Sequence, residues 1–121
     1  MSKRSKVRRK VVNTEHNEEI IFTRGTTEAI NLVASSFSAV SLQPGDEVLI
    51  SAMEHHSNIV PWQLACKQYG ATLRVIPVLD NGTLDQTAYQ EMLTPKVKIV
   101  GLVHVSNVLG TVNPIKHMIT L

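Results

Sequence analysis

Short apolar runs alternate along this chain with longer segments whose apolar residues recur at helical spacing, and turn residues separate the two. Strands are predicted for the runs at residues 20–23, 47–51, 72–76 and 98–103. Helices are predicted over residues 26–37, 58–69 and 85–93, and from near residue 114 onward. This βαβαβαβ order predicts an α/β fold, a mostly parallel sheet with flanking helices on both of its faces.

Single residues refine these elements. Pro61 is tolerated only in the first turn of its helix, Gly70 is predicted to end that helix, and Asp85 is predicted to cap the next one. The run at 98–103 is the most apolar, which predicts a central strand. The inner face of the first helix is predicted to consist of Ile30, Leu32, Val33 and Phe37.

The composition is that of one globular domain. Of the 121 residues 43% are hydrophobic, which argues against disorder. No apolar run approaches the roughly 20 residues that span a bilayer, so no membrane partner is predicted. The charged start leads into no apolar segment and does not resemble a secretory signal. The one cysteine, Cys66, cannot form an internal disulfide, and a cytoplasmic location is therefore predicted.

The basic charge is concentrated at one end. Six of the 12 lysines and arginines lie within residues 1–10, whereas the remainder holds six basic against ten acidic residues. Residues 1–12 are predicted to be a separate basic segment, the solvated end of a truncated helix. A nucleic-acid-binding arm or a targeting address is the alternative, but no aromatic residue interleaves the charges and nucleic acid is not predicted as a partner.

The first candidate motif is Gly25-Thr26-Thr27, directly after the first predicted strand. Glycine would allow the backbone to turn sharply, and the amides at the start of the next helix would then face an anion. Two adjacent hydroxyls add donors, so a phosphate dianion is the predicted ligand. The alternative is an ordinary threonine cap with Glu28 in the first turn.

The second motif, Glu54-His55-His56, follows the second predicted strand. The imidazole of His55 could lie flat against an aromatic cofactor ring. A metal site that includes His104 is an alternative, but neighbouring side chains on an extended segment point to opposite sides, and no metal site is predicted. A pair of surface histidines without a role is the other alternative.

The third motif places Asn107 just past the last predicted strand, where its amide could donate to a cofactor oxygen. The alternative is that Asn107 satisfies a turn in which Gly110 adopts a positive φ. Because all three motifs follow strands, they are expected on one edge of the sheet. Cys66 lies in the middle of a predicted helix without a partner base, which favours packing over a nucleophilic role.

Together, in this order, the three motifs resemble those of class-V aminotransferase-like enzymes. The segment from Met53 to Trp62, with Ser106-Asn107-Val108, is most similar to the cysteine desulfurase and selenocysteine lyase branch. The resemblance implies that residues 13–121 are part of the large domain of a fold-type-I pyridoxal-phosphate enzyme. By this resemblance, Thr26 and Thr27 would hold the phosphate of pyridoxal 5′-phosphate, His55 would stack on its pyridine ring, and Asn107 would contact the ring oxygen and the substrate.

The resemblance further implies an ancestral activity, the removal of sulfur from L-cysteine to give L-alanine, and a homodimer. The family also needs a lysine in a Ser-x-His-Lys setting, an aspartate facing the pyridine nitrogen and a sulfur-accepting cysteine, and the 121 residues contain none of these motifs. No catalytic residue is therefore assigned. The chain is predicted to be a truncated desulfurase-like protein that is inactive alone, and a product of a broken gene.

Two alternatives remain open. The chain could be a non-catalytic module that binds the cofactor, a full-length desulfurase or a sulfur-acceptor protein. It could also be one half of a split desulfurase. In the family, the strand that matches residues 20–23 pairs with strands encoded further on, so it is expected to lack neighbours, and the other strands are expected to leave an apolar face uncovered.

Overall fold

The structure, a computed structural model, describes residues 12–121. Its helices are α2 (Thr26–Ser41), α3 (Val60–Tyr69), α4 (Gln86–Met92) and α5 (Ile115–Ile119), and its strands are β1 (Glu47–Ser51), β2 (Thr72–Ile76) and β3 (Val97–Gly101). Short 3-10 turns, η1 (Asn17–Glu19) and η2 (His56–Asn58), precede α2 and α3. The predicted basic segment at 1–12 lies, except for its last residue, outside the described residues.

The three strands form a parallel sheet in the order β2-β1-β3. Ile50 of β1 lies opposite Val75 on one side and Gly101 on the other. β1 is therefore the central strand, and its last four residues are all buried. The prediction of a central strand at 98–103 is wrong, since β3 is an edge of this sheet and alternates between half-buried and exposed residues. Apolar composition indicates burial of a strand's faces and does not determine its lateral neighbours.

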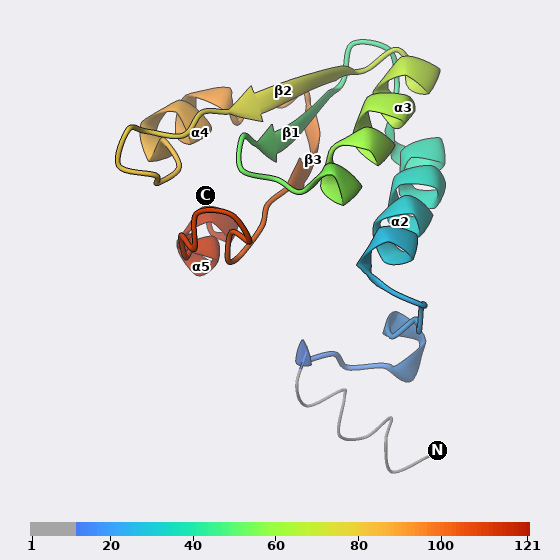
Figure 1. The fold of residues 1–121 in the computed structure, drawn as a ribbon. Coiled ribbons are helices and arrows are strands. Elements are labelled where there is room, and N and C mark those ends of the chain that lie inside the picture. Colours follow the sequence, from blue (N-terminus) through green and yellow to red (C-terminus); the bar gives the residue numbers. More distant parts are fainter. Residues whose placement is uncertain (1–11) are drawn as a thin grey trace.

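Helices cover both faces of the sheet, as predicted. α2 and α3 lie on one side of the strands and α4 and α5 on the other (Figure 1). Val48 and Ile50 pack towards α3 with Trp62, Ala65 and Cys66. On the opposite face Leu49 packs with Ile76, Leu84, Tyr89 and Met118. Alternate residues of β1 thus enter two separate cores, because successive side chains of a strand point to opposite faces. No helix in residues 12–121 is long and apolar enough to cross a membrane.

The strand predicted at residues 20–23 is wrong for the described part of the chain. This segment is extended but joins no sheet, and Ile21 and Phe22 are 69% and 62% exposed. Figure 1 shows the chain before α2 running away from the sheet. An apolar run becomes a strand only where a neighbour supplies its hydrogen bonds, and no described strand lies beside this one.

The inner face of α2 also differs from the prediction. Ile30 packs against the core, but Leu32, Val33 and Phe37 are between 41% and 50% exposed. The buried residues of α2 are Ala34 and Ser38, whose small side chains allow α2 to approach α3 closely. The other helix signals are confirmed. Gly70 ends α3 in the left-handed conformation, and the carboxylate of Asp85 accepts the Ala88 amide at 2.9 Å.

Candidate functional site

The loops that follow β1 and β3 meet at the carboxyl edge of the sheet. The carboxylate of Glu54, three residues beyond β1, accepts the backbone N–H of Val103, two residues beyond β3, at 3.0 Å. The two residues are 49 positions apart in the sequence. Ligands of open parallel sheets bind at this edge, so the second and third candidate motifs lie where they were expected.

His55 is placed by local hydrogen bonds at the start of η2. The Ser57 amide donates to His55 Nδ1 at 3.1 Å, and the Ser57 hydroxyl lies 3.0 Å from the same nitrogen. Because Nδ1 accepts the amide proton, a neutral ring carries its own proton on Nε2. His55 is exposed, so a ligand can reach this residue from the solvent.

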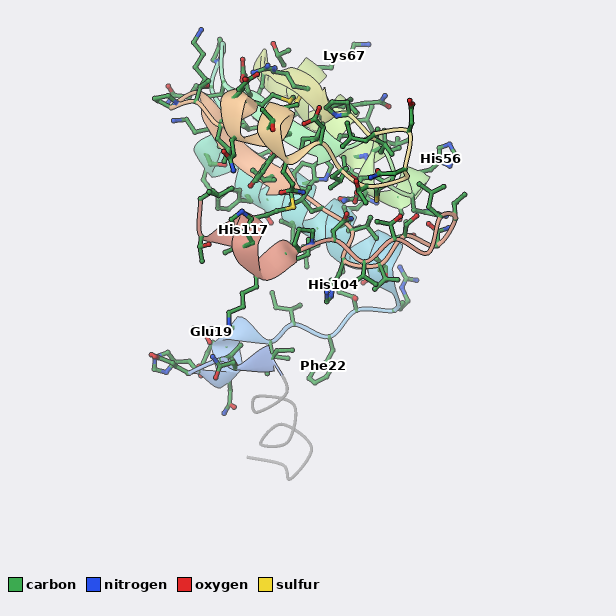
Figure 2. All side chains as sticks on the ribbon, turned by 90° about the vertical axis from the view of Figure 1, so that its left-hand side faces the viewer. Glu19, Phe22, His56, Lys67, His104 and His117 are labelled. Atoms are coloured by element: carbon green, nitrogen blue, oxygen red, sulfur yellow. The ribbon has the colours of Figure 1, made fainter. Side chains whose placement is uncertain are left out.

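The neighbouring histidines do not form a metal site with His55. The rings of His55 and His56 meet edge to face, with centroids 6.0 Å apart and planes at 81°. In Figure 2 the side chains of His56 and His104 lie on separate parts of the surface. Within residues 12–121 no group of three or more histidine, cysteine, aspartate or glutamate side chains could hold a metal ion.

Thr26 and Thr27 are the first two residues of α2, and both are exposed. The cap residue is Gly25 rather than either threonine, and no side chain caps this end, so the alternative of an ordinary threonine cap is wrong. The first amides of a helix have no acceptor within it, and the helix dipole places partial positive charge there. Thr26 and Thr27 therefore combine free hydroxyls with an end suited to an anion.

Gly25 differs from its predicted role. Its φ of 173° and ψ of 179° are those of extended backbone, so no sharp turn occurs there. A Cβ built at Gly25 would meet nothing within 4 Å. Gly25 instead lines a shallow hollow together with Arg24, Thr26, Thr27, Glu28 and Asn31. The Arg24 Nε donates to the Glu28 carboxylate at 2.6 Å, and this exposed pair leaves the hollow without a net charge from its side chains.

Asn107 occupies a tight turn after β3, and its side chain is exposed. The turn is held by Ser106, which is 3% exposed and accepts the amides of Val108 and Leu109 at 3.3 and 3.0 Å through its hydroxyl. Gly110 then adopts a φ of 71°, the left-handed conformation that the alternative interpretation of this motif as a turn expects. Asn107 thus lies at an exposed position of this turn, where a ligand can reach it.

The structure joins the sequence-predicted residues in pairs rather than in one pocket. The loops of His55 and Asn107 are tied by Glu54, and α2, which carries Thr26 and Thr27, contacts η2 directly. The hollow at the start of α2 is lined by neither His55 nor Asn107. The candidate residues thus lie on elements that meet pairwise: α2 contacts η2, and the loop after β1 is joined to the loop after β3.

Sequence reasoning missed two polar residues that organise this edge. Glu54 was noted only as part of its motif, although its carboxylate joins both loops. Asn113 is 2% exposed, and its Nδ2 donates to the Val103 carbonyl at 2.8 Å while its backbone amide donates to the His104 carbonyl at 2.8 Å. The sequence around Glu54 and Asn113 carries no signal of these roles, because both residues bind backbone groups of Val103, which lies elsewhere in the chain.

Cys66 is confirmed as a packing residue. It is 5% exposed in the core between α3 and the sheet, and burial raises the pKa of its thiol. Since the thiolate is the nucleophilic form, this cysteine is poorly suited to accept a sulfur atom.

Comparisons with known proteins point to one family. The model of the family Aminotransferase class-V matches residues 1–121. A cysteine desulfurase of Dickeya dadantii is 51% identical over 116 residues, which are 93% of this chain and 28% of that protein. The crystal structure of the cysteine desulfurase CsdA from Escherichia coli matches 96% of this chain and 29% of its own, with a TM-score of 0.88 and 36% identity.

A more distant structure shares the fold alone. It is a C-DES mutant with glycine covalently linked to its PLP cofactor, and it matches at a TM-score of 0.79 and 23% identity, over 96% of this chain and 30% of that one. The chain thus spans a little under a third of the length of the relatives it matches. Because the family model matches the entire length of this chain, the chain belongs to the class-V aminotransferase family.

Proposed function

We propose that these residues form the phosphate-binding and ring-facing side of a pyridoxal 5′-phosphate site of the cysteine desulfurase type. Thr26, Thr27 and the amides of α2 bind the phosphate, His55 lies against the pyridine ring, and Asn107 contacts the ring oxygen and the substrate. The observation that carries this proposal is the Glu54–Val103 hydrogen bond, because it joins the two loops that bear His55 and Asn107 at one edge of the sheet.

The residues present fit such a cofactor. The phosphate would approach a helix start where Gly25 has no side chain and where nothing lies within 4 Å of a built Cβ. The exposed hydroxyls of Thr26 and Thr27 and the free amides of the first turn supply donors. When bound, the cofactor supplies an electron sink for bonds broken at the α-carbon of the substrate.

We also propose that this chain by itself does not release sulfur from cysteine. The 121 residues contain no Ser-x-His-Lys motif, and the one cysteine is buried with a raised thiol pKa. A desulfurase that uses this site needs a cofactor-binding lysine and a sulfur-accepting cysteine in addition to these residues. A polypeptide that supplies both would be the natural partner of the chain, and a mixture of the two would form alanine and sulfide.

The proposal is tested with pyridoxine 5′-phosphate, which lacks the aldehyde and therefore cannot react with exposed lysines. Its affinity for the full chain is measured by titration calorimetry, beside pyridoxine without phosphate. We expect Thr27→Val to weaken binding by about 10-fold or more, because a hydrogen bond to a charged group is lost. Thr87→Val is the matched control, since Thr87 is likewise the exposed second residue of a helix, α4.

The ring-facing role is tested in the same titration. His55→Ala should weaken binding, whereas His56→Ala, the exposed neighbour, should leave it unchanged. Equal effects of His55→Ala and His56→Ala on the affinity, or of Thr27→Val and Thr87→Val, would overturn the proposal. Alanine and sulfide formed from cysteine by the chain alone, at rates above those of free pyridoxal 5′-phosphate, would overturn the second part of it.

A further inference from the structure

We propose that Glu54 is the positioning residue of this site, holding the loop of His55 and the loop of Asn107 in one fixed arrangement. This inference rests on the proposed function, which gives the two loops a shared ligand. Glu54 acts through these loops rather than on that ligand, because both oxygens of its carboxylate accept hydrogen bonds from the loops.

The carboxylate of Glu54 accepts from three segments of the chain. Its Oε2 accepts the Ser51 hydroxyl at the end of β1 and the Val103 amide after β3, the latter at 3.0 Å. Its Oε1 accepts the Asn58 side-chain amide of η2 at 2.6 Å. His55 follows Glu54 directly, so a displacement of this carboxylate displaces His55 relative to the segment that leads to Asn107.

The hydrogen-bond network continues from Glu54 through Asn58 to Trp62 in the core, and the donor and the acceptor of each of these bonds are fixed. Trp62, which is 4% exposed, donates its indole N–H to Asn58 Oδ1 at 2.8 Å. An indole nitrogen can only donate, so the Asn58 oxygen must face Trp62 and the Asn58 nitrogen must face Glu54. Every partner of Glu54 is therefore a donor, and position 54 requires a group that accepts at both of its atoms.

Gly101 allows this network to lie against the end of β3. A Cβ at Gly101 would come within 3.3 Å of Asn58 Nδ2, 3.4 Å of Asn58 Oδ1 and 3.4 Å of the Trp62 indole nitrogen. The contact with Asn58 Nδ2 is tighter than those of most real Cβ atoms, so an alanine would require the Asn58 side chain to shift by a few tenths of an ångström. The network is thus bounded by β3 on one side and by the core on the other, and it has little room to rearrange.

The direction of the network specifies which substitution breaks it and which restores it. Glu54→Gln keeps the shape but turns one acceptor into a donor, which then faces either the Asn58 amide or the Val103 amide. Adding Asn58→Asp resolves the conflict. The new aspartate accepts both from the glutamine amide and from the Trp62 indole, and the glutamine oxygen still accepts from Ser51 and Val103. The double variant also keeps the total charge of the pair.

The first measurement needs no ligand. The chain has one tryptophan, so its NMR spectrum contains one indole N–H signal, and this signal reports on the network directly. We expect the indole and the Val103 amide to exchange with solvent at least about 10-fold faster in Glu54→Gln, because their acceptors are lost or displaced. Exchange should return to near the original rate in Glu54→Gln with Asn58→Asp.

A second variant, at the end of β3, tests the same network without changing Glu54. Gly101→Ala should shift the indole signal and speed its exchange, whereas Gly25→Ala should not, since a Cβ at Gly25 meets nothing within 4 Å. Gly101 and Gly25 both have backbone angles that alanine tolerates, so the two variants differ in space alone. This pair tests the network even if Glu54→Gln fails to fold.

The second measurement is the affinity for pyridoxine 5′-phosphate. Glu54→Gln should bind several-fold more weakly with the phosphate contacts of Thr26 and Thr27 intact, and the double variant should recover the affinity. Unchanged exchange and affinity in Glu54→Gln, or a folded double variant that recovers neither, would overturn the positioning role. Failure of the unmodified chain to bind the probe would instead overturn the proposed function, and the ligand-free exchange would still decide whether Glu54 fixes the two loops.

Discussion

Cys66 and Tyr89 show how burial sets the chemistry of single residues in this chain. Both side chains are at most 5% exposed, and desolvation raises the pKa of each. Burial disfavours the charged form because the surrounding protein cannot replace the lost hydration. Burial of Cys66 therefore favours the neutral thiol over the thiolate.

The thiol should react slowly while the chain is folded. At a pH just below the ordinary thiol value of 9.0, alkylation of Cys66 by iodoacetamide is expected to be at least about 10-fold slower in the native chain than in urea. Because the raised pKa stabilises the fold only while the thiol is protonated, this contribution is complete below pH 9.0 and is lost as the pH rises through the raised value. Cys66→Ala should remove that part of the pH dependence of stability. Equal alkylation rates in the native chain and in urea would contradict the predicted slow reaction of the thiol.

Sequence reasoning predicted the location of the candidate residues but not the residues that hold their loops in place. Thr26, Thr27, His55 and Asn107 are all exposed at the ends of elements, where their motifs indicated. The role of Glu54 could not be predicted because its partner, Val103, is 49 positions away and contributes only a backbone amide. Almost every residue has a backbone N–H, so the sequence does not show which of them a carboxylate binds. A glutamate with this role therefore cannot be told from a surface glutamate by sequence alone.

At the scale of elements, the sequence predicted the bounds of β1 and β2 but not the features that depend on contacts with distant parts of the chain. β1 and β2 have the predicted bounds, and β2 begins just after Gly70, the residue that ends α3. The prediction at 20–23 failed because a strand depends on its neighbours. The face of α2 was misassigned because helical periodicity identifies an apolar stripe but not what covers it.

α4 offers a clean test of one local signal. Asp85 accepts the Ala88 amide at 2.9 Å and so satisfies one of the free donors at the start of this seven-residue helix. Asp85→Ala is expected to lower the free energy of unfolding by about 1 kcal/mol, measured by urea denaturation. Asp80→Ala, in the exposed turn just before, is the matched control and should cost far less. Equal losses would mean that charge, rather than the cap, is responsible.

At the scale of the whole molecule, the outer surface of α2 remains largely apolar and exposed. α2 lies over α3, yet its outward residues Val33, Phe37 and Val40 stay exposed, Val40 to 84%. These positions are spaced three and four apart and so form one stripe. Phe22 and Ile21, in the segment before α2, add further exposed apolar surface. Apolar surface of this extent is typical of association sites.

The purified chain is therefore expected to self-associate as its concentration rises. Val40→Lys with Val33→Lys should shift sedimentation profiles towards the monomer, because two charges would have to be desolvated on association. The melting temperature should barely change, since neither side chain enters the described cores. Lysines at Gln90 and Glu91, exposed positions of α4, serve as the control. Association that persists in the α2 variant would place the contact elsewhere.

The strand order β2-β1-β3 has a consequence for the time course of folding. β1 is the first strand to be synthesised, but one of its two neighbours, β3, follows about 50 residues later. At a synthesis rate of roughly 5–20 residues per second, the central strand waits seconds for its second edge. The bond from Val103 to Glu54 can form only after that, so the loop of His55 acquires its final shape late. The geometry of the candidate site is thus a product of the last stages of sheet assembly and depends on a long-range closure of the kind that slows folding.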